Sequence, residues 1–137
     1  MLIVRVLRLL RVLRVLKIAR YSSGFQTMGS TLKRSYRELI LLALFLSTAT
    51  ILFSTIMYYM EKDDPSTVFT SIPASCWWCI VTMTTVGYGD MYPKTVVGKL
   101  FGSVVSIAGV ILLAFPISII VENFHNEYAE SDDDSAS

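Results

Sequence analysis

The chain has 137 residues, of which 53% are hydrophobic and 17% are charged. Soluble domains carry about 25% charged residues, so this composition argues against an ordinary soluble globular protein. Two segments without a charged residue, 39–59 and 100–121, are each long enough to form a helix of roughly 30 Å, the thickness of a bilayer core. Buried helices of a soluble protein are the alternative, but so short a chain offers little polar surface to cover two of them. We therefore predict a membrane protein.

The charges are distributed asymmetrically along the chain. Lys and Arg are concentrated before residue 38, where there is no acidic residue, whereas the segment from Glu122 onward carries six acids and no base. Because the Lys/Arg bias of short flanking segments sets membrane orientation, we expect both termini on the cytoplasmic side. The loop 61–64 and Asp90 then lie outside.

Residues 1–20 combine apolar residues with regularly spaced cations. A cation recurs at every third position: Arg5, Arg8, Arg11, Arg14, Lys17 and Arg20. On an α-helix these cations spiral around most of the circumference, while a 3₁₀-helix would align them on one face. A membrane-surface segment or a nucleic-acid-binding peptide is an alternative, but neither needs a strict period of three. Cations that move stepwise through a narrow polar gap do need it, and each charge moved across 100 mV is worth about 2.3 kcal/mol.

A linker helix and a first membrane span are expected next. Turn-forming residues occupy 21–24, and an apolar stripe follows at Phe25, Met28, Leu32 and Tyr36. This spacing predicts a short amphipathic helix within 21–35 that lies at the inner membrane surface. The span itself is predicted over 36–60, with Tyr58 and Tyr59 at the outer interface.

A shorter helix is predicted over 71–84, after a polar outer loop. Ser71 is a suitable N-cap, and Pro73 falls in the first turn, where its missing N–H does no harm. The helix is too short to span, so it enters the membrane and returns. Cys76 and Cys79 have the spacing of a redox pair, but without a βαβ pattern we interpret them as packed, unpaired thiols.

The segment Thr85-Val86-Gly87-Tyr88-Gly89 carries the most specific pattern in the chain. It ends a run from residue 65 that has no charged residue. The two glycines permit backbone angles that let successive carbonyls point the same way, and four such loops replace the hydration shell of a potassium ion. With Thr84 and Asp90 on either side, this segment resembles the selectivity filter of potassium channels.

The resemblance implies roles for the residues around this segment. Potassium ions, the permeating cargo, would be held by the backbone carbonyls of Thr85, Val86, Gly87 and Tyr88 in a tetramer, because one loop cannot surround an ion. Trp77 would donate to Asp90, and Trp78 to Tyr88 of a neighbouring chain, as supports of the filter. Tyr92 matches the position at which external tetraethylammonium binds. Residues 1–20 resemble the voltage-sensing fourth helix of voltage-gated potassium channels.

The last helix is predicted over 98–124. Gly109 matches a gating hinge, although close helix packing explains a mid-helix glycine equally well, and Pro116 should kink the helix. Val121 matches the residue that closes the inner gate. Shaker-type and Shab-type channels carry a second proline in this bend, where the chain has Ser118.

The resulting expectation is an all-helical membrane protein of the plasma membrane that assembles as a tetramer. It consists of a sensor helix (1–20), a linker helix (21–35), a pore domain (36–124) and an acidic cytoplasmic tail (125–137). The resemblance points to the Shab-like group of voltage-gated potassium channels. Because loss of the second proline is a feature of modifier subunits, two functions stay open: a self-sufficient channel subunit, or a silent subunit that alters the gating of Shab-type partners.

Several further expectations accompany this interpretation. Neither catalytic residues nor a cofactor is predicted, so the chain should not be an enzyme, and no nucleic-acid partner is expected. The lipid bilayer and like channel subunits are the expected partners. Because the acidic partners of the sensor cations are not in this sequence, we expect it to be a segment of a longer protein.

Overall fold

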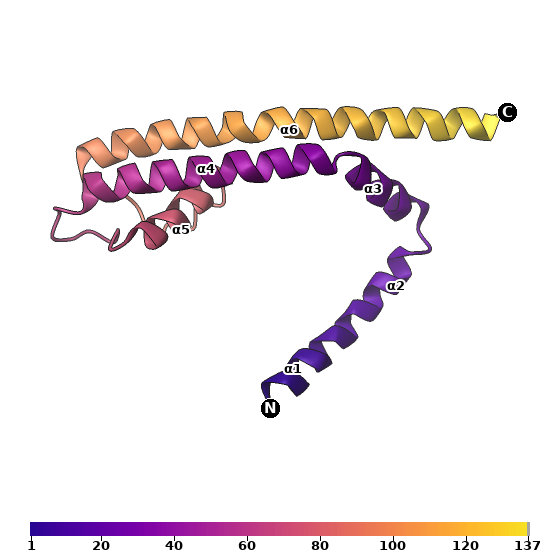
Figure 1. Cartoon of the computed structure of the whole chain (residues 1–137), viewed down its shortest axis with the longest axis horizontal. Helices are drawn as coiled ribbons and strands as arrows, with labels where there is room; N and C mark the ends of the chain where they lie inside the picture. The colour runs from indigo at the N-terminus through magenta and orange to yellow at the C-terminus, as the bar shows by residue number, and fades with distance from the viewer. Residues whose placement is uncertain (137) are drawn as a thin grey trace. The chain divides into compact units, whose positions relative to one another are not determined.

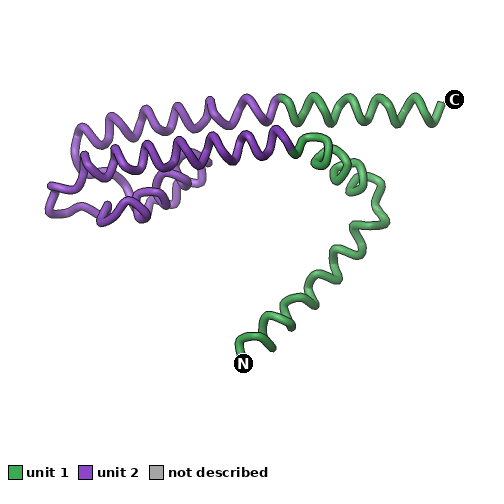
Figure 2. Tube along the Cα trace, viewed as in Figure 1, with its two compact units in different colours: residues 1–36, 119–137 green, residues 37–118 purple. Residues whose placement is uncertain are grey.

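The structure, a computed structural model, is described for residues 1–136 and is all-helical over that range, as predicted. Its elements are α1 (Leu2–Leu9), the 3₁₀-helix η1 (Leu10–Val15), α2 (Leu16–Ala19), α3 (Ser23–Arg34), α4 (Tyr36–Glu61), α5 (Ile72–Met83) and α6 (Val96–Ala136). They form two compact units, one of residues 37–118 and one of residues 1–36 with the helical residues from 119 onward (Figure 2).

The unit of residues 37–118 contains the main core. There α4 and the first part of α6 run antiparallel and side by side, and α5 packs close to them (Figure 1). The core cluster consists of Met57, Phe69, Trp78, Cys79, Met83 and Val105. Phe69 meets Trp78 edge to face at 5.5 Å between ring centroids, and Phe53 meets Phe101 in the same way at 6.0 Å. Most other apolar side chains of α4 and α6 remain exposed, as expected for helices that face lipid.

Two helices, α4 and α6, are long and apolar enough to cross a membrane, whereas α5 is not. α5 begins at an N-cap in which the Ser71 hydroxyl accepts a hydrogen bond from the Ala74 N–H (3.2 Å), with Pro73 in the first turn. It has 12 residues, or about 18 Å of helix. This length suits a helix that enters the bilayer and returns.

The structure differs from the predicted boundaries most at the end of the chain. α6 continues to Ala136, so the residues from 125 onward, predicted to be a separate acidic tail, are helical over the described range. Neither glycine nor a further proline follows Pro116, and Glu and Ala are good helix formers, so nothing in the sequence stops the helix. Pro116 itself lies inside α6 without ending it.

The sensor segment also combines two helix types. Residues 10–15 are 3₁₀-helical between two α-helical pieces. Arg11 and Arg14 both lie in this 3₁₀ stretch, where a step of three residues is one full turn. These two cations therefore share a face, while the α-helical pieces keep the spiral arrangement of the others.

Candidate functional site: an ion pathway

The segment after α5 is tied back onto the end of that helix. The N–H groups of Val86 and Gly87 both donate to the carbonyl of Val81, at 3.0 and 3.1 Å. The Thr85 N–H donates to the Thr82 carbonyl at 3.1 Å. These bonds satisfy carbonyls that the helix end would otherwise leave without partners. The N–H groups of Thr85, Val86 and Gly87 are therefore all used on the end of α5.

Its backbone reverses the sign of φ at every second residue. The φ angle is positive at Thr85 (63°), Gly87 (59°) and Gly89 (77°), but not at the residues between them. In an extended chain successive carbonyls point to opposite sides, and reversing φ at alternate positions turns them to the same side. Within residues 1–136, the carbonyls of 85–88 accept no hydrogen bond. A row of free carbonyl oxygens results, the group that replaces water around potassium in selectivity filters.

Thr85 is the part of this geometry that sequence reasoning missed. Glycine was expected to supply the unusual backbone angles, whereas a β-branched residue adopts one of them. A positive φ at such a residue is an outlier that costs about 1–3 kcal/mol and persists only where its surroundings enforce it. The bond from its N–H to Thr82 is one such constraint.

Trp77 contacts the C-terminal end of the segment. Its Nε1–H donates to Asp90 Oδ2 at 2.8 Å, the contact that the family resemblance implied. The same indole stacks on the Tyr88 ring, with 5.8 Å between centroids and 9° between planes. A single side chain of α5 thus holds residues on both sides of Gly89.

Trp78 occupies a different environment on the same helix. It is buried against Phe69 and lines a groove of about 390 Å³, together with Tyr92 and Lys99 among others. The implied hydrogen bond from Trp78 to Tyr88 involves a neighbouring chain, so it stays a prediction.

A fully buried carboxylate, that of Glu61, connects α4 to the segment that precedes α6. Glu61 Oε2 accepts the Lys94 N–H at 2.8 Å, and Oε1 accepts both the N–H and the hydroxyl of Thr95, at 3.1 and 2.5 Å. A Cβ added at Gly98 would collide with this carboxylate. Sequence reasoning assigned no role to Glu61. The one available signal was an acid placed directly after a long apolar span.

Two groups in the loops on either side of α5, Asp64 and Tyr92, have shifted pKa values. The hydroxyl of Ser66 donates to Asp64 Oδ1 at 2.5 Å and its N–H donates at 2.8 Å, and these bonds lower the pKa of the Asp64 carboxyl. Lys94 lowers the pKa of the Tyr92 phenol through a hydrogen bond and its charge. The Lys94 Nζ lies 3.9 Å from the centroid of the Tyr92 ring.

Gly109 lies against the end of α5. A Cβ built there would be 2.6 Å from Met83 Cα and 2.9 Å from the Met83 carbonyl oxygen. A side chain at this position would therefore displace the backbone that leads into residues 85–89. Of the two explanations left open for this glycine, the structure supports close packing directly. Further along α6, the Ser118 hydroxyl donates to the Ala114 carbonyl at 2.9 Å within the helix.

Polar side chains connect α3 to the C-terminal part of α6. The Ser30 hydroxyl donates to Glu127 Oε1, the Thr31 hydroxyl lies 3.4 Å from Glu127 Oε2, and Arg34 pairs with Glu130 at 3.3 Å. In addition, Asn123 Nδ2 donates to the buried Ser35 hydroxyl at 3.0 Å. The expected apolar stripe of α3 does not make these contacts. Its members Phe25, Met28 and Leu32 are all exposed.

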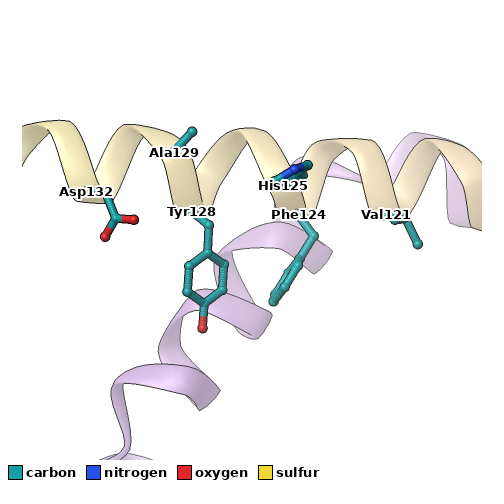
Figure 3. Close-up of a pocket in the computed structure, with 6 residues that line it drawn as sticks. All are labelled: Val121, Phe124, His125, Tyr128, Ala129 and Asp132. Carbon is teal, nitrogen blue, oxygen red and sulfur yellow. The ribbon is translucent and has the colours of Figure 1, made fainter.

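A groove of about 570 Å³ runs along the C-terminal part of α6 near the predicted gate (Figure 3). It is lined by Val121, Phe124, His125, Tyr128, Ala129 and Asp132. The ring centroids of Phe124 and Tyr128 lie 5.0 Å apart, and both rings point toward α3. Val121 is exposed in the single chain, so its predicted closing role depends on other copies.

Comparison with known proteins adds an independent finding. The sequence profile described as "Ion transport protein" matches residues 1–132. The chain belongs to the ion transport protein family. Membership in this family agrees with the prediction that the chain is not an enzyme, and together with the apolar α4 and α6 it makes the chain a membrane protein.

Several curated relatives within this family are similar to the chain. Human potassium voltage-gated channel subfamily A member 6 is 54% identical over 110 residues, which cover 80% of this chain and 21% of that protein. Human potassium voltage-gated channel subfamily A member 4 is 57% identical over 126 residues, which cover 92% of this chain and 19% of that protein. Subfamily A member 2 of Oncorhynchus mykiss is 52% identical over 110 residues, covering 80% and 22%.

The chain spans about a fifth of the length of the curated relatives it matches. All three are named as members of subfamily A, so the predicted assignment to the Shab-like group is not supported.

Proposed function

We propose that the chain forms the sensor helix, linker and pore of a voltage-gated, potassium-selective channel subunit, similar to its subfamily A relatives. The observation that carries the proposal is the backbone of residues 85–89. The N–H groups of its first three residues, 85–87, are used on the end of α5, and φ is positive at alternate positions, which leaves a row of free carbonyls. Carbonyl oxygens in such a row are the ligands that replace the hydration shell of potassium.

Selectivity requires four copies of this backbone around one axis. The carbonyls of one loop reach an ion from one side only, so a tetramer of like subunits completes the coordination. The carboxyl end of α5 carries about half a negative elementary charge and favours a cation on the path. Trp77 and Glu61 support the filter from either side: the first holds Asp90, and the second holds the backbone of the outer loop.

Voltage sensing rests on the cations of residues 1–20. Each charge that crosses a membrane potential of 100 mV contributes about 2.3 kcal/mol, so several cations in each of four subunits suffice to drive a gate. The contacts of Glu127 and Glu130 with α3 offer a mechanical route, because a movement of α3 is transmitted to the inner part of α6. In this proposal, four Val121 side chains close the path at the inner end, in a plasma membrane with both termini cytoplasmic.

A second candidate, the silent modifier subunit, rests on Ser118 alone. Serine keeps its N–H and permits a continuous helix, whereas a second proline would bend it further. The test is voltage clamp of the full-length subunit expressed without partners. Depolarisation-activated potassium current supports the self-sufficient channel. Silence at normal surface expression, with current restored by Ser118→Pro, supports the modifier.

A further inference from the structure

Ser131 presents its hydroxyl on an exposed part of α6. The residues from 128 to 136 are all exposed. The Ser131 hydroxyl donates to the Tyr128 carbonyl at 2.9 Å, a bond within its own helix. A hydroxyl used as a donor in this way keeps the lone pairs of its oxygen for another partner. Ser131 is therefore an accessible nucleophile to which the proposed function gives no role.

The charges that follow Ser131 form a pattern that a kinase can read. Asp132, Asp133 and Asp134 come directly after it, and the sequence contains neither Lys nor Arg after residue 99. Kinases select substrates by such charge patterns, and a basic substrate groove favours a serine that is followed by acids. Ser135 lacks this context, because only Ala136 and Ser137 follow it. The segment thus contains a serine that fits the pattern and, four residues later, one that does not.

The helix around Ser131 is opposed by its own charges. The carboxyl end of a helix favours cations, but the last turn of α6 has no basic residue. Glu130 and Asp134 are like charges four residues apart, a spacing that destabilises a helix. The contact with α3 stabilises the turn before Ser131, where Arg34 pairs with Glu130 at 3.3 Å. The turns beyond Glu130 can therefore unwind locally, which allows Ser131 to enter a kinase groove in an extended conformation.

We propose that Ser131 is a phosphorylation site for an acid-directed serine kinase that uses ATP. The Ser131 oxygen attacks the γ-phosphorus, an Oγ–P bond forms while the bond from phosphorus to the departing ADP oxygen breaks, and the hydroxyl proton passes to the base of the kinase. The site rests on the proposed function in one respect: both termini are placed on the cytoplasmic side, where ATP and kinases are found.

The phosphate changes the charge of a segment that is already acidic. It carries a charge of about −1.5 to −2 at neutral pH. It stands four residues after Glu127 and three before Asp134, the spacings at which like charges on a helix repel each other. The carboxyl end of the helix adds to this repulsion. Phosphorylation should therefore unwind α6 beyond Glu130.

The first test is treatment of the purified full-length protein with casein kinase II and ATP, followed by mass spectrometry of its peptides. We expect phosphate at Ser131 and none at Ser135. Asp134→Asn should lower the initial rate at Ser131 at least about ten-fold, the factor that corresponds to a lost hydrogen bond to a charged group. Glu122→Gln, the matched control, removes an acid that precedes the site and should leave the rate unchanged. Unmodified Ser131, or equal rates in wild type and Asp134→Asn, overturns the proposal.

The second test measures the effect on the helix. Amide hydrogen exchange over residues 131–136 should become about three- to ten-fold faster after kinase treatment of the wild type, as expected for added like-charge pairs at a helix end. Kinase-treated Ser131→Ala, the control, should exchange at the rate of untreated protein. Equal exchange with and without phosphate at Ser131 overturns the predicted unwinding. Both tests use purified protein and need no current, so a subunit without potassium current would refute the proposed function while the kinase reaction still decides the site.

Discussion

The contact between Gly109 and Met83 distinguishes packing from bending as the reason for a glycine in α6. Gly109→Ala places a Cβ 2.6 Å from Met83 Cα, whereas ordinary carbon contacts lie at about 3.5–4.0 Å. α5 and α6 must therefore separate by roughly 1 Å, because the nearest atoms are backbone atoms of Met83, which cannot rotate away as a side chain could. Gly102 provides the matched control, because a Cβ there meets its nearest atoms at 3.5 Å, an ordinary contact.

The magnitudes follow from two opposing effects. Overpacking of a tight contact costs up to about 3 kcal/mol, and replacing glycine by alanine in a helix returns about 1 kcal/mol. Gly109→Ala should thus lower the free energy of unfolding by about 2 kcal/mol per subunit, while Gly102→Ala should raise it by up to about 1 kcal/mol.

The assay measures the thermal stability of the detergent-solubilised full-length protein. Samples are heated to a series of temperatures, and size-exclusion chromatography then measures how much of the folded peak remains. We expect Gly109→Ala to lose its folded peak at a lower temperature than wild type, and Gly102→Ala to match or exceed wild type. If Gly109 served only as a hinge, both variants would be stabilised. Equal or higher stability of Gly109→Ala would therefore refute the packing argument.

Three more substitutions test the supports of the pathway. Glu61→Gln replaces one carboxylate oxygen, which accepts a hydrogen bond from a backbone N–H of Lys94 or Thr95, by an amide N–H₂ that cannot accept one. The backbone N–H left without an acceptor should lower the free energy of unfolding by about 1–3 kcal/mol, which the same thermal assay detects. Trp77→Phe keeps a ring for stacking but removes the bond to Asp90, so the current per channel at the surface should fall; unchanged current would mean that this bond does not brace the filter. Glu127→Ala removes the acceptor for α3 and should alter the voltage dependence of opening, as measured by tail currents, whereas the exposed Glu122→Ala should not.

Local sequence signals, such as capping residues and the ends of apolar runs, were sufficient to predict the bounds of α4 and α5. The predicted span 36–60 and the structural α4 differ by one residue at the end, and the helix predicted over 71–84 is observed as Ile72–Met83. Ser71 and Pro73 define the start of α5 through purely local chemistry. The end of α6 was misjudged, because acidity was taken as the sign of a tail although no helix-breaking residue is present.

The contacts that sequence could not reveal are those between distant residues. Glu61 and Thr95 are far apart in sequence, and only folding brings the carboxylate to the segment before α6. The positive φ of Thr85 arises from bonds to the preceding helix, against the preference of threonine itself. In α3 the periodicity identified the apolar face, but the partner of the polar face, Glu127, depends on tertiary arrangement.

The central claim is that the backbone of residues 85–89 selects potassium. Its most direct test is the reversal potential of the current carried by the full-length subunit, measured while external potassium replaces sodium. The account predicts a shift of about 59 mV for each tenfold change in potassium. It also predicts loss of this dependence in Gly87→Ala, where alanine is forced to a φ of +59°. A reversal potential that does not change with external potassium would contradict the account. So would a potassium dependence that is the same in Gly87→Ala as in wild type.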